Sequence, residues 1–280
     1  MRFCCLASGS EGNCTLVESS DEGETLRILV DCGLSFSLLK RKLLNRGMLP
    51  EGIHGVIITH EHADHCKGIV PLVRVLEVPV FMTYGTYLAN KEIRKNLKPI
   101  FLSPHKKVLF KGLGINPFPV PHDAREAVAL TVESKSFKIG VLTDVGVITK
   151  TIRDELEDVD ALILEFNYDD DLLSRSRYPE GLKKRISSKY GHLSNSSAMG
   201  FAKDFLQRER KVLVAAHLSS SNNSRNYVTA LLDQLCHEKK TESFIADQDN
   251  GTWNSKPPEA SSRKTDIKGN ANSGGGEGFQ

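Results

Sequence analysis

The apolar residues of this chain fall mostly in short runs that are separated by turn residues. Runs such as 26–30 and 55–59 are almost continuously apolar, which is typical of strands buried on both faces. The same criterion predicts further strands at residues 3–7, 15–18, 80–83, 108–110, 127–133, 137–142, 161–166 and 212–216. The polar turns between these runs therefore divide the chain into many short sheet elements.

Helical spacing of apolar residues interrupts this strand pattern. Residues 35–46 carry leucines at helical intervals, and Gly47 ends that predicted helix. Pro71 is expected to open a short helix. Further helices are predicted at residues 149–157, 194–208 and 224–237. Strands outnumber helices early and alternate with them later, so we expect an α/β (α+β) fold with sheet layers covered by helices, in one domain of residues 1–253.

Composition changes the picture mainly at the carboxyl end. Residues 254–280 are rich in Ser, Gly, Asn and Lys with little to bury, and are expected to form a disordered polar tail. The net charge of +2 is too small to indicate a polyanionic partner by itself. The chain has no run of about 20 apolar residues, so no membrane span is expected. Without a signal peptide or a Cys-x-x-Cys pair, a reducing, cytoplasmic location is expected.

The segment of residues 59–65 follows the predicted strand 55–59 and concentrates metal-binding side chains. Its ligand-type residues are His60, His62, Asp64 and His65. In an extended loop the first two can point the same way, and the last two fall past the turn, where they could serve a second ion. The helical zinc-protease motif is excluded, because position 64 is Asp where that motif requires His. We expect a metal site here and not a polar surface loop.

Four more polar residues end or follow apolar runs: Asp31, His122, Asp144 and His217. Singly, each has an ordinary explanation as a helix N-cap or a hydrogen-bonded polar residue. Together with the segment 59–65 they form a set of ligand-type residues at predicted strand ends, where α/β proteins usually place their sites.

The order of these residues resembles the metallo-β-lactamase superfamily, most nearly its YycJ/WalJ type. The matching motifs are residues 6–13, 30–33, 143–144, 191–195 and 216–219, together with the segment 59–65. The resemblance covers about residues 1–250. It implies a four-layer αββα sandwich with two divalent metal ions, Zn²⁺ or Mn²⁺, at one edge of the sheets.

The resemblance also divides the ligands between the two ions. It implies that His60, His62 and His122 bind one ion, and that Asp64, His65 and His217 bind the other. Asp144 would bridge the ions, and Asp31 would support the ligand loop from behind. Asp64 is also expected to orient the attacking water.

Glu165 and His192 match a pair in the related transfer-RNA 3′-processing enzymes. Such a carboxylate fixes the tautomer of the imidazole, which then contacts or protonates a leaving oxygen. The alternative is that Glu165 is a capping or surface group and His192 an ordinary loop histidine. We include Asp64, Glu165 and His192 as candidate catalytic residues. The chain lacks the long Gly/Pro-rich arm with which those enzymes grip transfer RNA, which disfavours that function.

Two segments are candidates for substrate binding. Residues 174–190 carry the basic residues Arg175, Arg177, Lys183, Lys184 and Arg185. The loop after His217 offers the polar residues Ser219, Asn222 and Asn223. A basic strip of this kind can contact nucleic-acid phosphates, whereas the alternatives are a solvated helix face and an ordinary turn.

The expected function is hydrolysis of nucleic acid by a binuclear metal-dependent phosphodiesterase. The resemblance implies a DNA exonuclease acting in the 5′ to 3′ direction. Two alternatives are an RNA-processing nuclease and a hydrolase of a small phosphodiester, lactone or thioester. A non-catalytic metal-binding or redox module is disfavoured by the complete ligand set. The sequence makes no prediction about the oligomeric state.

Overall fold

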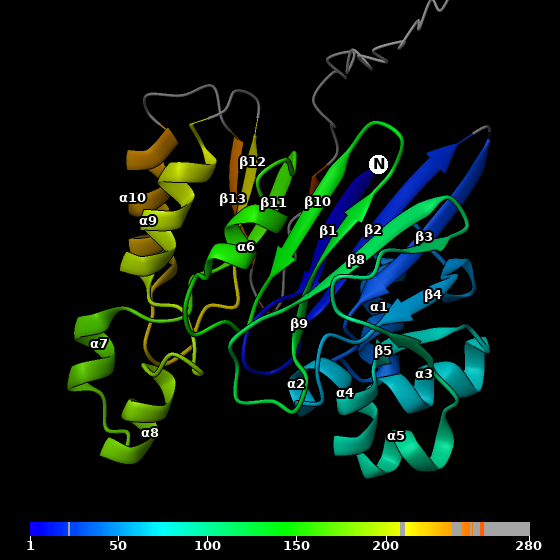
Figure 1. Ribbon diagram of the computed structural model, residues 1–280, viewed down its shortest axis with the longest axis horizontal. Helices are drawn as coiled ribbons and strands as arrows, with labels where there is room; N and C mark the ends of the chain where they lie inside the picture. Colours follow the sequence, from blue (N-terminus) through cyan, green and yellow to red (C-terminus); the bar gives the residue numbers. More distant parts are fainter. Residues whose placement is uncertain (22, 208–210, 237–241, 247, 249–252, 255–280) are drawn as a thin grey trace, which may run out of the picture.

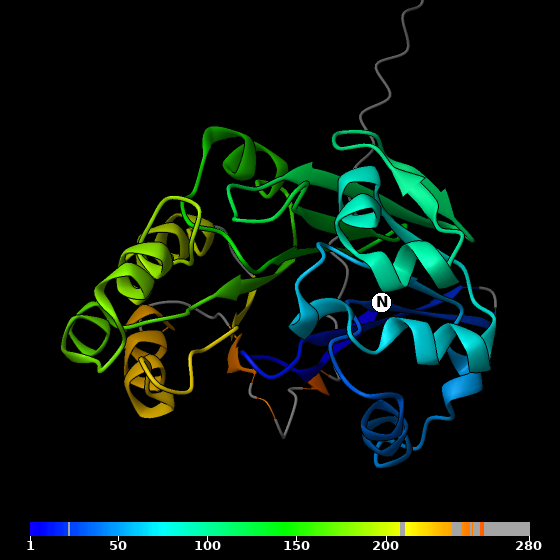
Figure 2. The same ribbon diagram turned by 90° about the horizontal axis from the view of Figure 1, so that it is seen from below.

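Two seven-stranded sheets lie face to face, and helices cover both outer faces (Figure 1). This computed structural model describes residues 1–21, 23–207, 211–236, 242–246, 248 and 253–254. Seen from below, the helices of the first half of the chain lie on one side and those of the second half on the other (Figure 2). The predicted αββα order of layers is confirmed.

The first sheet has the strand order β14-β1-β2-β3-β4-β5-β6. Strands β1 to β3 pair antiparallel, and β3 to β6 pair parallel. The strands are β1 (Arg2–Ala7), β2 (Cys14–Asp21), β3 (Glu24–Val30), β4 (Gly55–Ile57), β5 (Val80–Thr83), β6 (Ile100–Leu102) and β14 (Trp253–Asn254). Asn254, the first residue of the predicted tail, pairs with Phe3, and the rest of that tail lies outside the described residues.

The second sheet repeats this arrangement in the order β13-β12-β11-β10-β9-β8-β7. Strands β7 to β10 pair antiparallel, and β10 to β13 pair parallel. The strands are β7 (Val108–Phe110), β8 (Leu113–Pro119), β9 (Val128–Glu133), β10 (Lys138–Leu142), β11 (Ala161–Glu165), β12 (Val212–Ala216) and β13 (Glu242–Ile245). Both sheets therefore direct their parallel strands toward one edge of the sandwich.

The core has three apolar layers, which explains the continuous apolar runs. On β3, Ile28 and Val30 face the second sheet, whereas Leu29 packs beneath the helices. On β11, Ile163 faces inward and Leu164 faces the outer helices. Strands buried on both faces need apolar residues at every position, so the expectation drawn from these runs is confirmed.

Helices cover each sheet through apolar residues on one side. The first sheet is covered by α1 (Phe36–Leu44), α3 (Ile69–Leu76) and α5 (Lys91–Asn96). The second is covered by α6 (Lys150–Glu155), α9 (Asn195–Phe205) and α10 (Arg225–Cys236). The remaining helices are η1 (Pro50–Gly52), α2 (Ala63–Cys66), α4 (Tyr84–Ala89), α7 (Asp170–Arg175) and α8 (Glu180–Ile186). Within the described part of the chain, no helix is long and apolar enough to cross a bilayer.

Several element boundaries differ from the sequence-based expectations. Helix α3 begins at Ile69, two residues before Pro71. Proline has no N–H group, and the first turn of a helix tolerates it because the N–H groups there have no partner within the helix. Asp64 and His65 lie on the one-turn helix α2, where the sequence indicated a loop. Strand β8 was not predicted, because it contains Pro117 and Pro119.

Candidate metal centre

The predicted ligands and the supporting residue Asp31 meet at the edge where the parallel strands end. Asp31 directly follows β3, His60 comes shortly after β4, and His217 directly follows β12. Asp144 lies two residues beyond β10. Because neighbouring parallel strands finish at the same edge of a sheet, short loops bring these side chains together.

Three of these residues adopt a backbone conformation that is uncommon outside glycine. Asp31, Asp144 and His217 have φ angles of 64°, 58° and 57°. Such left-handed conformations cost about 1–3 kcal/mol each and persist where the surrounding structure imposes them, often at functional sites. All three lie just after a strand, where the loop of the candidate centre begins, and their left-handed conformation turns the chain sharply there.

Side-chain ligand atoms lie within 4.8 Å of one another in several groups at this edge. One group is His60, His62 and His122, and another is Asp64, His65 and His217. Asp144 forms a further group with His60 and His65, which belong to different triads. A fourth group joins Asp144 to Glu165, His192 and His217. The structure thus brings all seven predicted ligands together at one edge, beside Glu165 and His192.

The chemistry of the cluster fits divalent cations. Among the described residues, His60 Nε2, His217 Nε2 and Asp144 Oδ2 are buried without a hydrogen-bond partner. A buried polar atom left without a partner costs about 1–3 kcal/mol, so such atoms call for an explanation. Mixed imidazole and carboxylate donors without a thiolate suit Zn²⁺ or Mn²⁺. A bound cation would satisfy these atoms and offset the carboxylate charge.

Asp31 makes the contacts that a supporting role requires. Its Oδ1 accepts the backbone N–H of Thr59 at 2.9 Å. Its Oδ2 accepts from His65 Nδ1 at 2.8 Å, which leaves Nε2 of that ring for a metal. The nearby His122 Nδ1 donates to the carbonyl oxygen of Gly191 at 3.0 Å, which likewise leaves its Nε2 for a metal.

Glu165 and His192 form a buried pair beside the ligands. Glu165 Oε1 accepts from His192 Nδ1 at 2.8 Å and from His217 Nδ1 at 3.0 Å. Its Oε2 accepts the backbone N–H groups of Val145 at 3.0 Å and Leu193 at 3.2 Å. Although burial opposes ionisation, the charge of His192 and hydrogen bonds from both imidazoles lower the pKa of Glu165 to about 2. Because this carboxylate is completely buried, its interpretation as a surface group is wrong.

Two close neighbours of the ligands were not predicted. Asn13 Nδ2 lies 3.3 Å from Asp64 Oδ2 and 3.0 Å from His65 Nε2. Asp123 Oδ1 lies 3.4 Å from His122 Nε2. Asn13 belongs to a motif that carries the resemblance, and Asp123 is adjacent to a predicted ligand. Neither position shows a pattern that would indicate its spatial contact.

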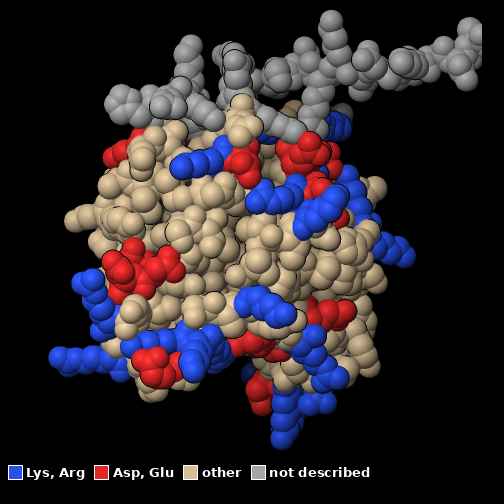
Figure 3. All heavy atoms as spheres, turned by 60° about the vertical axis from the view of Figure 1, so that its left-hand side comes forward, with Lys and Arg blue, Asp and Glu red and all other residues tan. Residues whose placement is uncertain are grey.

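The basic strip runs from the end of α7 through the connection that carries Arg177 into α8, and its members differ in surroundings. Lys183 Nζ donates to Ser174 O at 2.8 Å and pairs with Glu180 at 3.0 Å. Arg185 pairs with Asp123, which joins α8 to the candidate centre. The exposed members are Arg175, Arg177, Lys184 and Arg185. Figure 3 shows basic and acidic side chains mixed along the lower part of the face that carries these helices.

The loop after His217 is held by its own polar residues. Ser219 Oγ accepts the backbone N–H of Asn222 at 3.1 Å. Asn223 Nδ2 donates to Phe166 O at 2.7 Å and to Asn167 O at 3.0 Å. The Asn222 side chain is buried, with only 1% of the residue exposed. These residues shape the loop, and burial separates Asn222 from a polynucleotide at the surface.

Comparisons with known proteins agree with this geometry. The profile of the beta-lactamase superfamily domain matches residues 26–216. Exodeoxyribonuclease YycJ of Bacillus anthracis is 30% identical over 243 residues, which cover 85% of this chain and 90% of the relative. Exodeoxyribonuclease WalJ of Streptococcus pneumoniae is 31% identical over 230 residues, which cover 79% of this chain and 83% of the relative.

A solved structure extends the comparison to the fold. The metallo-β-lactamase fold protein YhfI of Bacillus subtilis superimposes with a TM-score of 0.67 at 19% identity, covering 90% of this chain and 99% of that protein. Similarity at this level of identity concerns the architecture alone, whereas the domain profile and the two curated relatives concern the sequence. The chain therefore belongs to the metallo-β-lactamase superfamily, within its YycJ/WalJ type.

Proposed function

We propose that this protein is a DNA exonuclease that uses two divalent metal ions and degrades DNA in the 5′ to 3′ direction. The chain is a metal-dependent hydrolase of the phosphodiesterase class, as its family and its relatives named exodeoxyribonuclease indicate. The observation that carries the two-metal part of the proposal is the joining of seven ligand-type residues to the Glu165–His192 pair at one strand edge. DNA as substrate is proposed from the names of the relatives, and the 5′ to 3′ direction from the family resemblance.

The two triads and Asp144 would hold the ions. When bound, a pair of divalent ions supplies a Lewis acid for the phosphate oxygens and makes water available as a nucleophile near neutral pH. Asp31 and Glu165 fix the ring orientation of His65 and His217 through their Nδ1 atoms. Ligands fixed in this way need little rearrangement during the reaction.

His192 is placed to act on the leaving group. Its Nδ1 donates to Glu165, so Nε2 is the nitrogen that remains for substrate. The side chain is 24% exposed, in contrast to the buried His65 and His217. A protonated His192 can donate from Nε2 to the leaving oxygen, while Glu165 stabilises the imidazolium.

The exposed residues of α7 and α8 provide a route for the polynucleotide. Arg185, in the last turn of α8, contacts Asp123, whose carboxylate lies beside a ligand of the first triad, so the carboxyl-terminal end of α8 lies at the rim of the centre. Phosphates along a strand could be contacted by Arg175, Arg177 and Lys184, which are exposed on this segment. A small substrate would need no such extended basic surface.

The identity of the substrate and the direction of degradation are tested together. Metal-loaded protein is incubated with single- and double-stranded DNA and with matched RNA, each labelled at either the 5′ or the 3′ end. The proposal expects 5′-labelled DNA to release labelled mononucleotides or short products from the first turnover, and 3′-labelled DNA to shorten progressively. Faster degradation of RNA would support the RNA-processing alternative, and cleavage of neither polymer would leave the small-molecule alternative.

Metal content gives a first quantitative prediction. Protein that has been stripped with a chelator and reloaded is expected to bind about two ions per chain, because seven ligands exceed the usual four of one zinc-class ion. His65→Ala is expected to reduce this number toward one. Elemental analysis measures it, and a single ion that is unaffected by His65→Ala would contradict the two-metal site.

Charge reversal on α7 and α8 gives a second prediction. Replacing Arg175, Arg177 and Lys184 with Glu should weaken DNA binding, because these side chains are exposed where the strand is expected to pass. Each lost phosphate contact to double-stranded DNA should flatten the slope of log affinity against log salt by about 0.9. Binding isotherms at several salt concentrations measure both effects.

The matched control for the α7–α8 variant is reversal of Lys135 and Lys150, which are also highly exposed but lie outside this segment. The ratio of DNA to small-phosphodiester hydrolysis should fall only in the α7–α8 variant. Equal loss on both substrates would show that the strip is structural, and unchanged DNA affinity would favour the small-molecule alternative.

A further inference from the structure

A groove borders the candidate metal centre on the side of Asp64. Its volume is about 540 Å³. Asp64 is itself part of the wall, together with Ser10 and Glu11 from the β1–β2 turn, Leu38 of α1 and Lys67 after α2. The groove is therefore continuous with the centre and is distinct from the basic segment on α7 and α8.

The walls of the groove are fixed to the metal ligands by close backbone packing. Asn13 N–H donates to Asp64 O at 2.7 Å, and Gly33 N–H donates to Asn13 O at 2.9 Å. A Cβ atom on Gly33 would lie 1.6 Å from Asp64 O, and one on Gly12 would lie 2.4 Å from Gly33 O. Only glycine permits this approach, so the β1–β2 turn is held at a defined distance from Asp64.

The groove and α8 lie at opposite ends of the ligand cluster. Asp64, in the groove wall, belongs to the triad with His65 and His217. Asp123, which pairs with Arg185 of α8, instead lies beside His122 of the other triad. A strand that crosses both triads must therefore leave on the groove side if it enters on the α8 side.

The lining of the groove offers the donor types that a nucleotide needs. Lys67 is an exposed cation whose Nζ also donates to the backbone carbonyl oxygen of Glu11, Ser10 is an exposed residue with a hydroxyl group, and Leu38 contributes an apolar side. These groups match a phosphate, a sugar and a base face, respectively. The volume falls within the range of about 300–1,000 Å³ that is typical of small-ligand sites, so it suits one nucleotide better than a duplex.

We propose that this groove binds the nucleotide next to the scissile phosphate, on the Asp64 side of the centre. This inference rests on the proposed nuclease function and assigns a binding site to it. Lys67 attracts the backbone phosphate, whereas the neighbouring Glu11 opposes it. Removing the charge of Lys67 should therefore raise KM for an oligonucleotide, and removing the charge of Glu11 should lower it.

Filling the groove is the first test. Ser10→Trp should lower the ratio of kcat/KM for a single-stranded oligodeoxynucleotide to that for a small chromogenic phosphodiester by about tenfold, the effect of losing about 1.4 kcal/mol of binding. Lys67→Ala should raise KM for the oligonucleotide and flatten the salt slope by about 0.7, and Glu11→Gln should lower KM.

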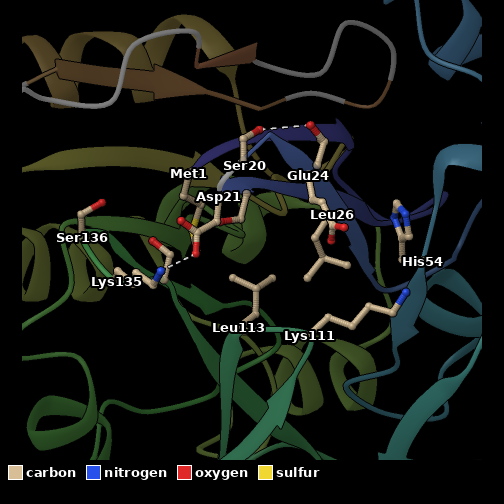
Figure 4. Close-up of a pocket in the computed structure, with 14 residues that line it drawn as sticks. Met1, Ser20, Asp21, Glu24, Leu26, His54, Lys111, Leu113, Lys135 and Ser136 are labelled. Atoms are coloured by element: carbon tan, nitrogen blue, oxygen red, sulfur yellow. Dashed lines mark hydrogen bonds and ion pairs between the residues drawn. The ribbon is translucent and has the colours of Figure 1, made fainter.

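The control residue comes from a second pocket at the opposite end of the strands. That pocket, of about 480 Å³, lies between the β2–β3 and β9–β10 turns, where Lys135 pairs with Asp21 at 2.6 Å (Figure 4). Lys135→Ala should leave unchanged both the ratio of kcat/KM for the oligonucleotide to that for the small phosphodiester and the slope of log affinity against log salt. If Lys67→Ala and Glu11→Gln also match wild type, the groove assignment is wrong even if Ser10→Trp misfolds. Failure of the wild-type protein to degrade DNA would instead overturn the proposed function.

Discussion

Replacing Asp64 with alanine is expected to lower the turnover of DNA by about 10²–10³-fold or more while the protein stays folded. The side chain touches Asn13 and the ligand triad, and 24% of it is exposed at the rim of the centre. Its removal deletes a proposed metal ligand, which is also the group expected to orient water. The local fold depends instead on the Asp64 carbonyl oxygen, which accepts from Asn13 N–H and is retained in alanine.

Steady-state turnover and thermal unfolding of the Asp64→Ala protein measure these two effects separately. Asp171→Ala is a matched control, because Asp171 is a highly exposed aspartate on α7 outside the ligand cluster. The control should behave like wild type in both assays. Wild-type turnover by a well-folded Asp64→Ala protein would contradict the assignment of Asp64 to the centre.

Replacing His192 with alanine should lower turnover by about 10²–10⁴-fold, the usual contribution of a general acid or base. Metal content should change little, because His192 Nδ1 donates to Glu165 and the ring belongs to neither triad, although it lies within ligand distance of Asp144 and His217. Glu165→Gln should behave differently. Glu165 holds both His192 and His217, so its loss should weaken metal binding by about 10–100-fold as well as turnover.

Metal titration and turnover measured on the same preparations distinguish these outcomes. His105→Ala provides the control, since His105 is a half-exposed histidine that pairs with Glu155. If His192→Ala loses an ion, His192 is a ligand and the role of His217 must be re-examined. If its turnover equals that of wild type, the leaving-group role is refuted.

The layers of the fold could be predicted because a strand that is buried on both faces appears in the sequence as a continuous apolar run. The end of β3 from Ile28 to Val30, β10 after its first residue and β11 up to Leu164 carry only apolar residues or glycine, and each strand was located. Strand β8 was missed because Pro117 lies in it. The structure tolerates this proline where the pairing of β8 with β7 has already ended, at Ile115. Helix α2 has a single turn, which is too short to show periodicity.

The convergence of the ligand-type residues could be predicted because most of them follow strand ends, and parallel strands finish at the same edge of a sheet. The contacts of isolated polar residues could not. Asn13 reaches Asp64 across 51 positions of sequence, and Asp123 meets Arg185 across 62. The sequence likewise groups Lys183 with its basic neighbours, whereas in the structure its ammonium group is bound to Ser174 O. Such contacts depend on which distant residues lie close together in the fold, and local sequence patterns do not indicate this.

The central claim is that DNA hydrolysis by this chain requires two metal ions held by the seven ligands. The most direct measurement titrates chelator-stripped protein with Zn²⁺ or Mn²⁺ and follows the rate of degradation of end-labelled DNA. The account predicts no degradation without metal and a maximal rate at about two equivalents per chain. Undiminished degradation by the stripped protein, or a maximal rate at one equivalent, would contradict it.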